Sequence, residues 1–458
     1  MSIATAKQPE ALKDFMYNGA GKKPEFIVYA ENVSSRLMYA CRFLFQQGLI
    51  CNFILTDNEK EFLDSSLIKI NYSNKDYPNT FHIQPSGLLS ETGIREFVPP
   101  IKNENNTVKF YPTECGDCDF DIFSAIFYLI SRYVEWQKFV KDNHGRFEIL
   151  NSILYKISLH KVPVIENWLV DIKLKIQAKF PGIKFENRPF KFVSTIDVDN
   201  VYAFKAKPFY RNLGGGIKDF LRGDFKMLSA RIGTVLLRRK DPFDAYDYQI
   251  DLSEKHHVPL IYFFLYSNHS KFDRTIQPNH RLFNKLLYKF NDRNVTYGLH
   301  PSYLSSEDSS LLRKELTLLN KNSGKNIVCS RQHYLRFNIR TTPLELYEAG
   351  IRYDFTMGYA SGVGFRAGTS LPFYYYDFKN EKELDLLMVP FVAMDGAFYI
   401  YDNVSLDTAK DELLSLAQQL QRVNGLFITV FHDRSFSKEL YPGWKELYFE
   451  LHKHLGKL

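Results

Sequence analysis

The chain has 458 residues, of which 45% are apolar, 16% aromatic and 24% charged, and its formal net charge is +7. The aromatic content excludes a disordered chain, and so mild a basic excess over so many residues does not predict a nucleic-acid-binding protein. Five cysteines are too few, and odd in number, for a disulfide-rich secreted scaffold.

The N-terminal part of the chain is predicted to be a separate α/β domain, placed at residues 1–188. It contains no evident catalytic constellation, so its function is unassigned. Strands are predicted at 25–29 and 51–55, and helices at 34–46, 121–140 and 164–180.

The C-terminal part, residues 189–458, alternates between apolar strands and helices. This alternation favours a parallel sheet covered by helices on both faces. About six or seven such units predict an α/β fold with a closed or nearly closed (β/α) barrel. Strands are predicted at 192–198, 258–265, 295–299, 327–329, 351–355 and 426–431, and helices from Asp241-Pro242 and at 281–291, 307–319, 343–349, 407–422 and 444–454.

Polar side chains follow five of these strands, at the edge where a βα barrel gathers its functional residues. Taken singly, each also fits a turn, a loop or a structural hydrogen bond. Taken together, five strand ends of this kind favour a catalytic site. In chain order they are Asp197 and Asp199, His300, Arg331 and His333, Asp354, and His432 with Asp433.

Asp197 and Asp199 are two residues apart on a strand, so they face the same side. Two carboxylates this close repel each other, so both ionise readily only when a cation lies beside them. The pair therefore predicts a divalent metal. One aspartate with His300 and His333 would form a site of two imidazoles and a carboxylate, with a position open for water, as in catalytic zinc sites. The other aspartate would then be free to act as a base.

The same residues, in this order, resemble the motifs of the polysaccharide deacetylase family (carbohydrate esterase family 4, the NodB-homology domain). The resemblance covers about residues 192–458 and is that of a divergent bacterial subgroup with an extra N-terminal domain. The five segments similar to the family motifs are 195–199 (TIDVD), 298–302 (GLHPS), 331–334 (RQHY), 353–356 (YDFT) and 430–433 (VFHD).

Two departures from the family pattern concern the metal. Thr296 stands where the second motif usually has its first histidine, and His333 stands where the third motif has proline. We infer that His333 replaces the missing histidine, which keeps a ligand set of one aspartate and two histidines.

The resemblance implies a metal-dependent hydrolase that removes N-acetyl groups from a glycan, or from a lipid- or nucleotide-linked amino sugar, of the cell envelope. It implies Asp199, His300 and His333 as ligands of a divalent transition metal, expected to be Zn²⁺. It further implies Asp197 as general base oriented by Arg331, His432 as general acid held charged by Asp354 or Asp433, and Tyr334 beside the oxyanion. The loop at 358–368 is interpreted as facing the substrate, with Phe365 and Arg366 contacting the sugar.

Two alternatives stay open on the same barrel. One is a degenerate, non-catalytic module that binds glycans. The other is an O-deacetylase or an amidase.

The segment Lys205–Lys240 has apolar residues at helical spacing and a strong excess of Lys and Arg. Such a basic amphipathic helix is typical of peripheral contact with an anionic membrane, although a helix packed on the barrel with a solvated basic face also fits. The first 15 residues lack the apolar core of a signal peptide, and the apolar runs are far shorter than the ~18 residues of a membrane span. We therefore expect a cytoplasmic protein that contacts the membrane at most peripherally.

Overall fold

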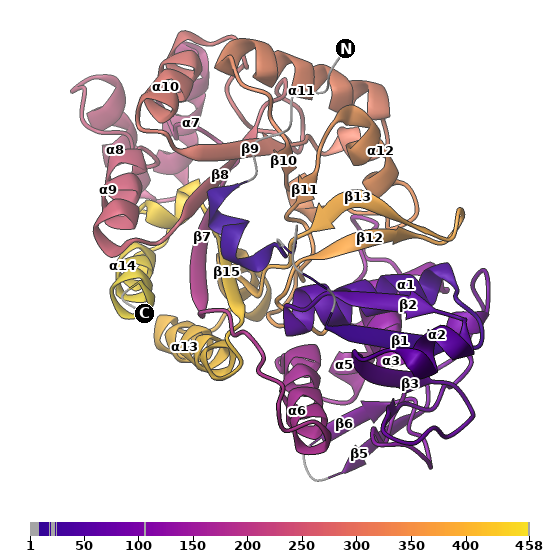
Figure 1. The fold of residues 1–458 in the computed structure, drawn as a ribbon. Helices are drawn as coiled ribbons and strands as arrows, with labels where there is room; N and C mark the ends of the chain where they lie inside the picture. The colour runs from indigo at the N-terminus through magenta and orange to yellow at the C-terminus, as the bar shows by residue number, and fades with distance from the viewer. Residues whose placement is uncertain (1–8, 18, 20–22, 24, 105–106, 457–458) are drawn as a thin grey trace.

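The computed structural model of the chain describes residues 9–17, 19, 23, 25–104 and 107–456, and within them the fold is α/β. A four-stranded sheet lies in the N-terminal half and a nine-stranded sheet in the C-terminal half (Figure 1). The predicted α/β class is therefore confirmed. Residues 1–8, on which the expected lack of a signal peptide partly depends, lie outside the described residues.

The N-terminal sheet is parallel, with the strand order β2-β1-β3-β4. Its central strand β1 (Phe26–Ala30) is buried along its whole length. The next helix, α1 (Ser35–Cys41), begins where the Ser34 hydroxyl accepts a hydrogen bond from the Leu37 N–H at 3.0 Å. The other elements are β2 (Phe53–Thr56), α2 (Glu59–Asp64), β3 (Ile68–Tyr72), β4 (Phe81–His82), β5 (Ile101–Glu104), β6 (Thr107–Phe110), α3 (Ile122–Ile130), α4 (Tyr133–Trp136), α5 (Ile153–Lys156) and α6 (Val164–Lys179).

The C-terminal sheet has the strand order β12-β13-β11-β10-β9-β8-β7-β15-β14. Every neighbouring pair is parallel except β12 with β13. The apolar run of β8 (Leu260–Leu265) is buried throughout, as is typical of a parallel strand covered on both faces. The other strands are β7 (Lys191–Val198), β9 (Thr296–His300), β10 (Cys329–Ser330), β11 (Tyr353–Asp354), β12 (Phe373–Asp377), β13 (Lys382–Met388), β14 (Ala393–Met394) and β15 (Leu426–His432).

One chain segment links two strands that lie far apart in this sheet, β11 and β15. β13 pairs with β11, and β14, separated from β13 by four residues, pairs with β15. Between them the Val389 N–H donates to the Asp354 carbonyl and the Val392 N–H to the Ile428 carbonyl. The sheet is curved (Figure 1), and this segment joins its β11 side to its β15 side.

Helices follow most strands of the C-terminal half, as the alternation predicts. Among the described residues, none of the helices is both long enough and apolar enough to cross a membrane. They are α7 (Phe209–Leu221), α8 (Phe225–Val235), α9 (Tyr246–His256), α10 (Arg281–Asp292), α11 (Ser309–Ser323), α12 (Thr342–Ala349), α13 (Leu406–Arg422) and α14 (Trp444–Leu455).

The helices predicted over 121–140 and from Asp241 differ from the structure. The helix predicted over 121–140 breaks at Arg132, which adopts a left-handed backbone (φ 55°) and separates α3 from α4. No helix begins at Asp241, and α9 starts later, at Tyr246. The Asp241 carboxylate instead accepts hydrogen bonds from the backbone N–H groups of 203–205, at 2.7 to 2.9 Å.

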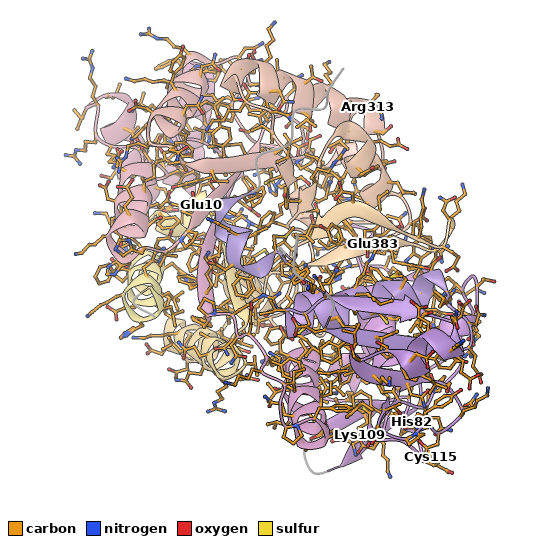
Figure 2. All side chains as sticks on the ribbon, in the orientation of Figure 1. Glu10, His82, Lys109, Cys115, Arg313 and Glu383 are labelled. Carbon is orange, nitrogen blue, oxygen red and sulfur yellow. The ribbon has the colours of Figure 1, made fainter. Side chains whose placement is uncertain are left out.

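The two halves share one hydrophobic core, which includes β1 and β8 side chains alike. Buried polar contacts reinforce it: Arg36 of α1 bonds the Glu381 carboxylate at 2.7 Å. Nearer the surface, Glu383 on β13, labelled in Figure 2, pairs with the half-exposed Arg42 at 3.0 Å. The division into domains at 1–188 and 189–458 stays a prediction.

Candidate metal centre and catalytic site

A cavity of about 500 Å³ lies at the carboxyl edge of the C-terminal sheet. Strand ends supply most of its polar wall, as expected for parallel strands whose carboxyl ends meet at one edge. The predicted site residues that line it are Asp197, Asp199, His300, His333, Tyr334, His432 and Asp433.

Asp199, His300 and His333 converge at the floor of this cavity, where one potential ligand atom from each lies within 4.8 Å of the others. The Asp199 Oδ1 atom is 3.5 Å from the Nε2 atom of each histidine. Within the described part of the chain, no other group of His, Cys, Asp and Glu side chains converges this closely. The three residues predicted as ligands are thus brought together.

Both imidazoles are oriented by a hydrogen bond at Nδ1. His300 Nδ1 bonds the Arg331 carbonyl, and His333 Nδ1 bonds the Asp273 carboxylate at 2.9 Å. A proton held at Nδ1 leaves the Nε2 lone pair free for a metal, the usual arrangement of metal-binding histidines. Asp273 is itself fixed by the Tyr303 N–H at 2.9 Å. The sequence analysis missed Asp273 because it lies in a loop rather than at a strand end.

Asp199 has the character of an unsatisfied ligand. Its Oδ1 atom is buried and has no hydrogen-bond partner, while Oδ2 accepts from Arg434 at 3.1 Å. Burial alone would raise the pKa of Asp199, but His333, His300 and Arg434 together lower it well below its ordinary value. An ionised, unpaired oxygen facing two Nε2 atoms fits a divalent cation.

Asp197 lies beside this group and is held by Arg331. The Arg331 Nη1 donates to Asp197 Oδ1 at 2.8 Å, and both side chains are buried. Arg331 is fixed in turn by its Nε bond to the Phe355 carbonyl and by the Phe263 ring, whose centroid is 4.5 Å from the guanidinium carbon. The predicted contact between Arg331 and Asp197 is present.

His432 is directly opposite Asp197 in the β7–β15 register. Its Nδ1 bonds Asp395 Oδ1 at 2.6 Å, and its backbone N–H donates to Asp395 Oδ2 at 2.7 Å. Burial alone would lower the pKa of His432, but the Asp395 carboxylate raises it to about 9. The histidine is therefore protonated at neutral pH.

The carboxylate that charges His432 was predicted wrongly. Asp354 bonds Ser330 and Thr356 instead, and burial raises its pKa to about 6. Asp433 accepts the Asn200 N–H at 2.7 Å. Asp395 follows β14, which has only two residues and was not predicted, so the rule that found the other strand ends did not reach it.

Tyr334 lines the cavity and is about one-third exposed. It and Leu335 both adopt left-handed backbone, with φ of 58° and 53°. Such strain in residues other than glycine persists where the surroundings enforce it and often marks a functional segment. Tyr334 is thus a partly exposed residue of the cavity wall, on a strained segment.

The other two predicted substrate contacts lie outside the cavity. Phe365 is fully buried, and its N–H donates to the His160 carbonyl. Arg366 is buried and forms a two-bond ion pair with Glu135, at 2.9 and 2.6 Å. The loop carrying them packs against the N-terminal half, so both residues hold the halves together.

The N-terminal half instead supplies part of the cavity wall, through His144 and Arg146. Arg146 donates to the Tyr334 carbonyl and to the Tyr401 hydroxyl, both at 3.0 Å. This contribution was not predicted, because it depends on how the halves pack rather than on a local pattern.

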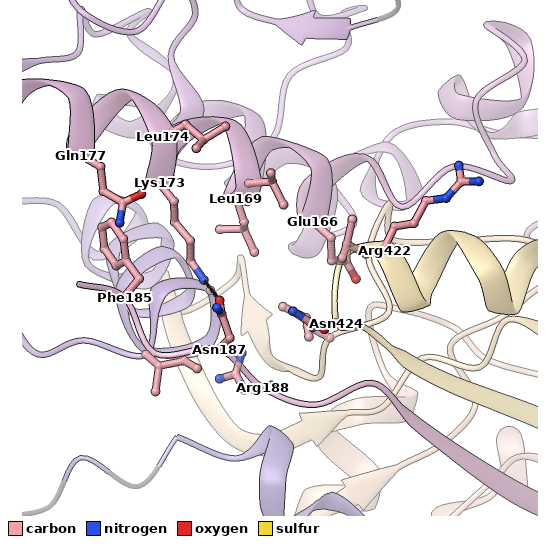
Figure 3. Close-up of a pocket in the computed structure, with 15 residues that line it drawn as sticks. Glu166, Leu169, Lys173, Leu174, Gln177, Phe185, Asn187, Arg188, Arg422 and Asn424 are labelled. Carbon is pink, nitrogen blue, oxygen red and sulfur yellow. Dashed lines mark hydrogen bonds between the residues drawn. The ribbon is translucent and has the colours of Figure 1, made fainter. Parts of the chain in front are cut away.

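A second cavity, of about 220 Å³, lies between α6 and the C-terminal half (Figure 3). Its Glu166 accepts hydrogen bonds from the Ser370 N–H and hydroxyl, and Lys173 approaches Asn187. No histidine or cysteine is among the residues that line it. It therefore lacks the groups that make the larger cavity a candidate active site.

Comparison with known proteins gives one family match, to the family of unknown function DUF7033, over residues 26–181. No curated protein sequence matches the chain. A structure named as a polysaccharide deacetylase from Mycobacterium smegmatis is 14% identical, with a TM-score of 0.39 and coverage of 60% of this chain and 86% of that one. Another, from Pseudomonas aeruginosa PAO1, is 12% identical, with a TM-score of 0.37 and coverage of 58% and 84%.

A third similar structure is a mutant of a CE4-family pseudoenzyme with restored enzymatic activity. It is 12% identical, with a TM-score of 0.22 and coverage of 58% of this chain and 65% of that one. At these identities and scores, the similarities establish neither the family nor the activity of this chain.

Proposed function

We propose that the protein is a metal-dependent hydrolase that removes N-acetyl groups from a glycan, or from a lipid- or nucleotide-linked amino sugar. The observation that carries this proposal is the convergence of Asp199, His300 and His333 in a cavity that also holds the Asp197 carboxylate and the His432 imidazole. The same proposal includes three further points: the C-terminal sheet forms a barrel, the two domains divide at residue 188, and the protein is located in the cytoplasm.

Asp199, His300 and His333 would hold the metal, for which Zn²⁺ is the expected ion, although Co²⁺, Ni²⁺ and Fe²⁺ suit the same ligands. When bound, a divalent metal would lower the pKa of a water molecule and polarise an acetamide carbonyl. The remaining chemistry falls to side chains of this chain.

Asp197 is the proposed general base. Its buried bond to Arg331 fixes the direction of the carboxylate, while its second oxygen, 3.9 Å from His300 Nε2, faces the proposed ligands. A carboxylate so held can take a proton from an attacking water.

His432 is the proposed general acid. Its Nε2 proton would pass to the departing amine, while Asp395, bonded at Nδ1, orients the ring and stabilises its protonated form. Since His432 and Asp197 are register partners on adjacent strands, acid and base face the same part of the cavity. The products would be acetate and a free amino sugar.

Acetate release tests this function. Purified protein loaded with Zn²⁺ should release acetate from at least one member of a panel of N-acetylated glycans, nucleotide-linked sugars and lipid-linked sugars, and Asp197→Asn should not. Release from O-acetylated glycans alone would indicate an O-deacetylase. If the protein neither binds metal nor releases acetate, the proposal is overturned and the degenerate glycan-binding module is favoured.

We expect Asp395→Asn to move the alkaline limb of the kcat/KM profile to lower pH. In the wild type the donating imidazolium is present below about pH 9 and is lost above it, because Asp395 raises the pKa of His432. Without that carboxylate the loss should occur nearer the ordinary histidine value of about 6.5. Asp354→Asn is the matched control, since Asp354 bonds Ser330 and Thr356 rather than His432. A limb that stays in place in Asp395→Asn would remove this role from Asp395.

A further inference from the structure

The helices α7 and α8 form a hairpin that exposes an unusual amount of apolar surface. The single basic helix expected here is broken at Gly223, whose backbone is left-handed (φ 70°), and α8 restarts where the Asp224 carboxylate accepts the Met227 N–H. Ten large apolar side chains of this hairpin are 44 to 77% exposed: Phe209, Tyr210, Leu213, Ile217, Phe220, Leu221, Phe225, Ile232, Leu236 and Leu237. A helix packed on the sheet would bury this face, so that alternative does not describe the structure.

The apolar side chains lie on one side of each helix. In α7, positions 209, 213, 217 and 220 recur at four- and three-residue steps, as do 225, 228, 232 and 235 in α8. Between the helices lies a groove of about 340 Å³ with an almost wholly apolar wall. The two helices therefore present one continuous apolar face.

The charge of the protein is concentrated in the same segment. Lys205–Lys240 carries ten of the 59 Lys and Arg residues and two of the 52 Asp and Glu residues, a net charge of +8. The remainder, with 49 basic and 50 acidic residues, has a net charge of −1. Lys218 on α7, and Arg222 at its C-terminal cap, lie on a different side from the apolar positions.

Both ends of the hairpin meet beside the candidate active site. Asp241, just after the hairpin, bonds the backbone N–H groups of Phe204 and Lys205, just before it, at 2.9 Å. Asn200 and Phe243, which flank these ends, both line the active-site cavity. Figure 1 shows α7 and α8 at the end of the molecule opposite the N-terminal sheet.

We infer that the α7–α8 hairpin docks the protein on an anionic lipid bilayer. Apolar side chains of the exposed face would enter the interface, and the surrounding Lys and Arg side chains would bind acidic headgroups, the two requirements of an interfacial helix. The charge concentrated in the hairpin selects a negatively charged surface over a second copy of this chain, whose own hairpin is equally basic. Docking would hold the cavity at the membrane surface, which, given the proposed function, favours a lipid-linked glycan as substrate.

Vesicle co-sedimentation tests the docking without reference to catalysis. The full chain should sediment with phosphatidylcholine vesicles containing about one-third phosphatidylglycerol, and much less with phosphatidylcholine alone. We expect at least a tenfold loss of binding in either of two triple variants, one apolar and one charged. They are Leu213→Ser, Ile217→Ser and Phe220→Ser, and Lys218→Glu, Arg222→Glu and Lys226→Glu.

The matched control replaces three apolar residues of the N-terminal half that are at least as exposed, Val98→Ser, Val140→Ser and Leu174→Ser, and should bind like the wild type. Circular dichroism confirms that each variant is folded, which we expect because the replaced side chains are exposed. No sedimentation of the wild type at low salt, or equal binding by the control and both hairpin variants, would overturn the inference. So would a dimer in light scattering that only the apolar variant dissociates. Acetate release in free solution is measured separately, so either proposal can fail alone.

Discussion

Replacement of His333 by alanine should reduce the bound metal from about one ion per chain to almost none, and acetate release with it. A catalytic zinc site with three protein ligands has no ligand to spare, and His333 supplies one of the two imidazoles. Elemental analysis of the purified protein, wild type beside His333→Ala, Asp199→Ala and His300→Ala, measures this directly.

His144→Ala is the matched control, because His144 lines the same cavity but stands outside the ligand group. It should retain the metal. Asp273→Asn should weaken the affinity by about 10- to 100-fold rather than abolish it, since Asp273 only orients His333. Full metal occupancy in His333→Ala would show that His333 does not replace the histidine absent at Thr296.

Removal of Glu135 should destabilise the fold by about 3–5 kcal/mol, the usual cost of leaving buried charge without its partner. Glu135 pairs with Arg132 at 2.8 Å and with Arg366 at 2.6 Å, and all three side chains are almost completely buried. Urea denaturation of Glu135→Ala measures the change. Arg366→Ala should act in the same direction.

The control for this experiment is Glu91→Ala, which breaks the exposed Arg95–Glu91 pair and should cost at most about 1 kcal/mol. If Arg366→Ala left stability unchanged but impaired acetate release, the residue would return to the substrate site for which the sequence suggested it. A large loss of stability confirms instead that Arg366 joins the two halves.

The sequence predicted best where function coincides with a long regular strand. β7 and β15 are apolar and clearly periodic, so Asp197, Asp199 and His432 at their ends could be placed beside one another in advance. The candidate ligands His300 and His333 followed from the same reasoning.

Prediction failed for residues whose positions depend on short strands or on packing between the two halves of the chain. β14 has only two residues, so Asp395 at its end went unnoticed and Asp354 was chosen in its place. Arg366 was interpreted as a substrate contact on a loop facing the substrate, yet its partner Glu135 is 231 residues away. No local pattern encodes a pairing between two such distant segments.

The pairing of β7 with β15 also has a consequence during synthesis. The Thr195 hydroxyl donates to the Thr429 carbonyl, 234 residues later, and every rung of this ladder spans a similar distance. While the chain is still on the ribosome, β7 can pair with β8 but keeps one edge open until β15 emerges. An open strand edge invites pairing with other chains, so nascent chains of this protein should depend on a chaperone or remain at risk of aggregation until β15 is made.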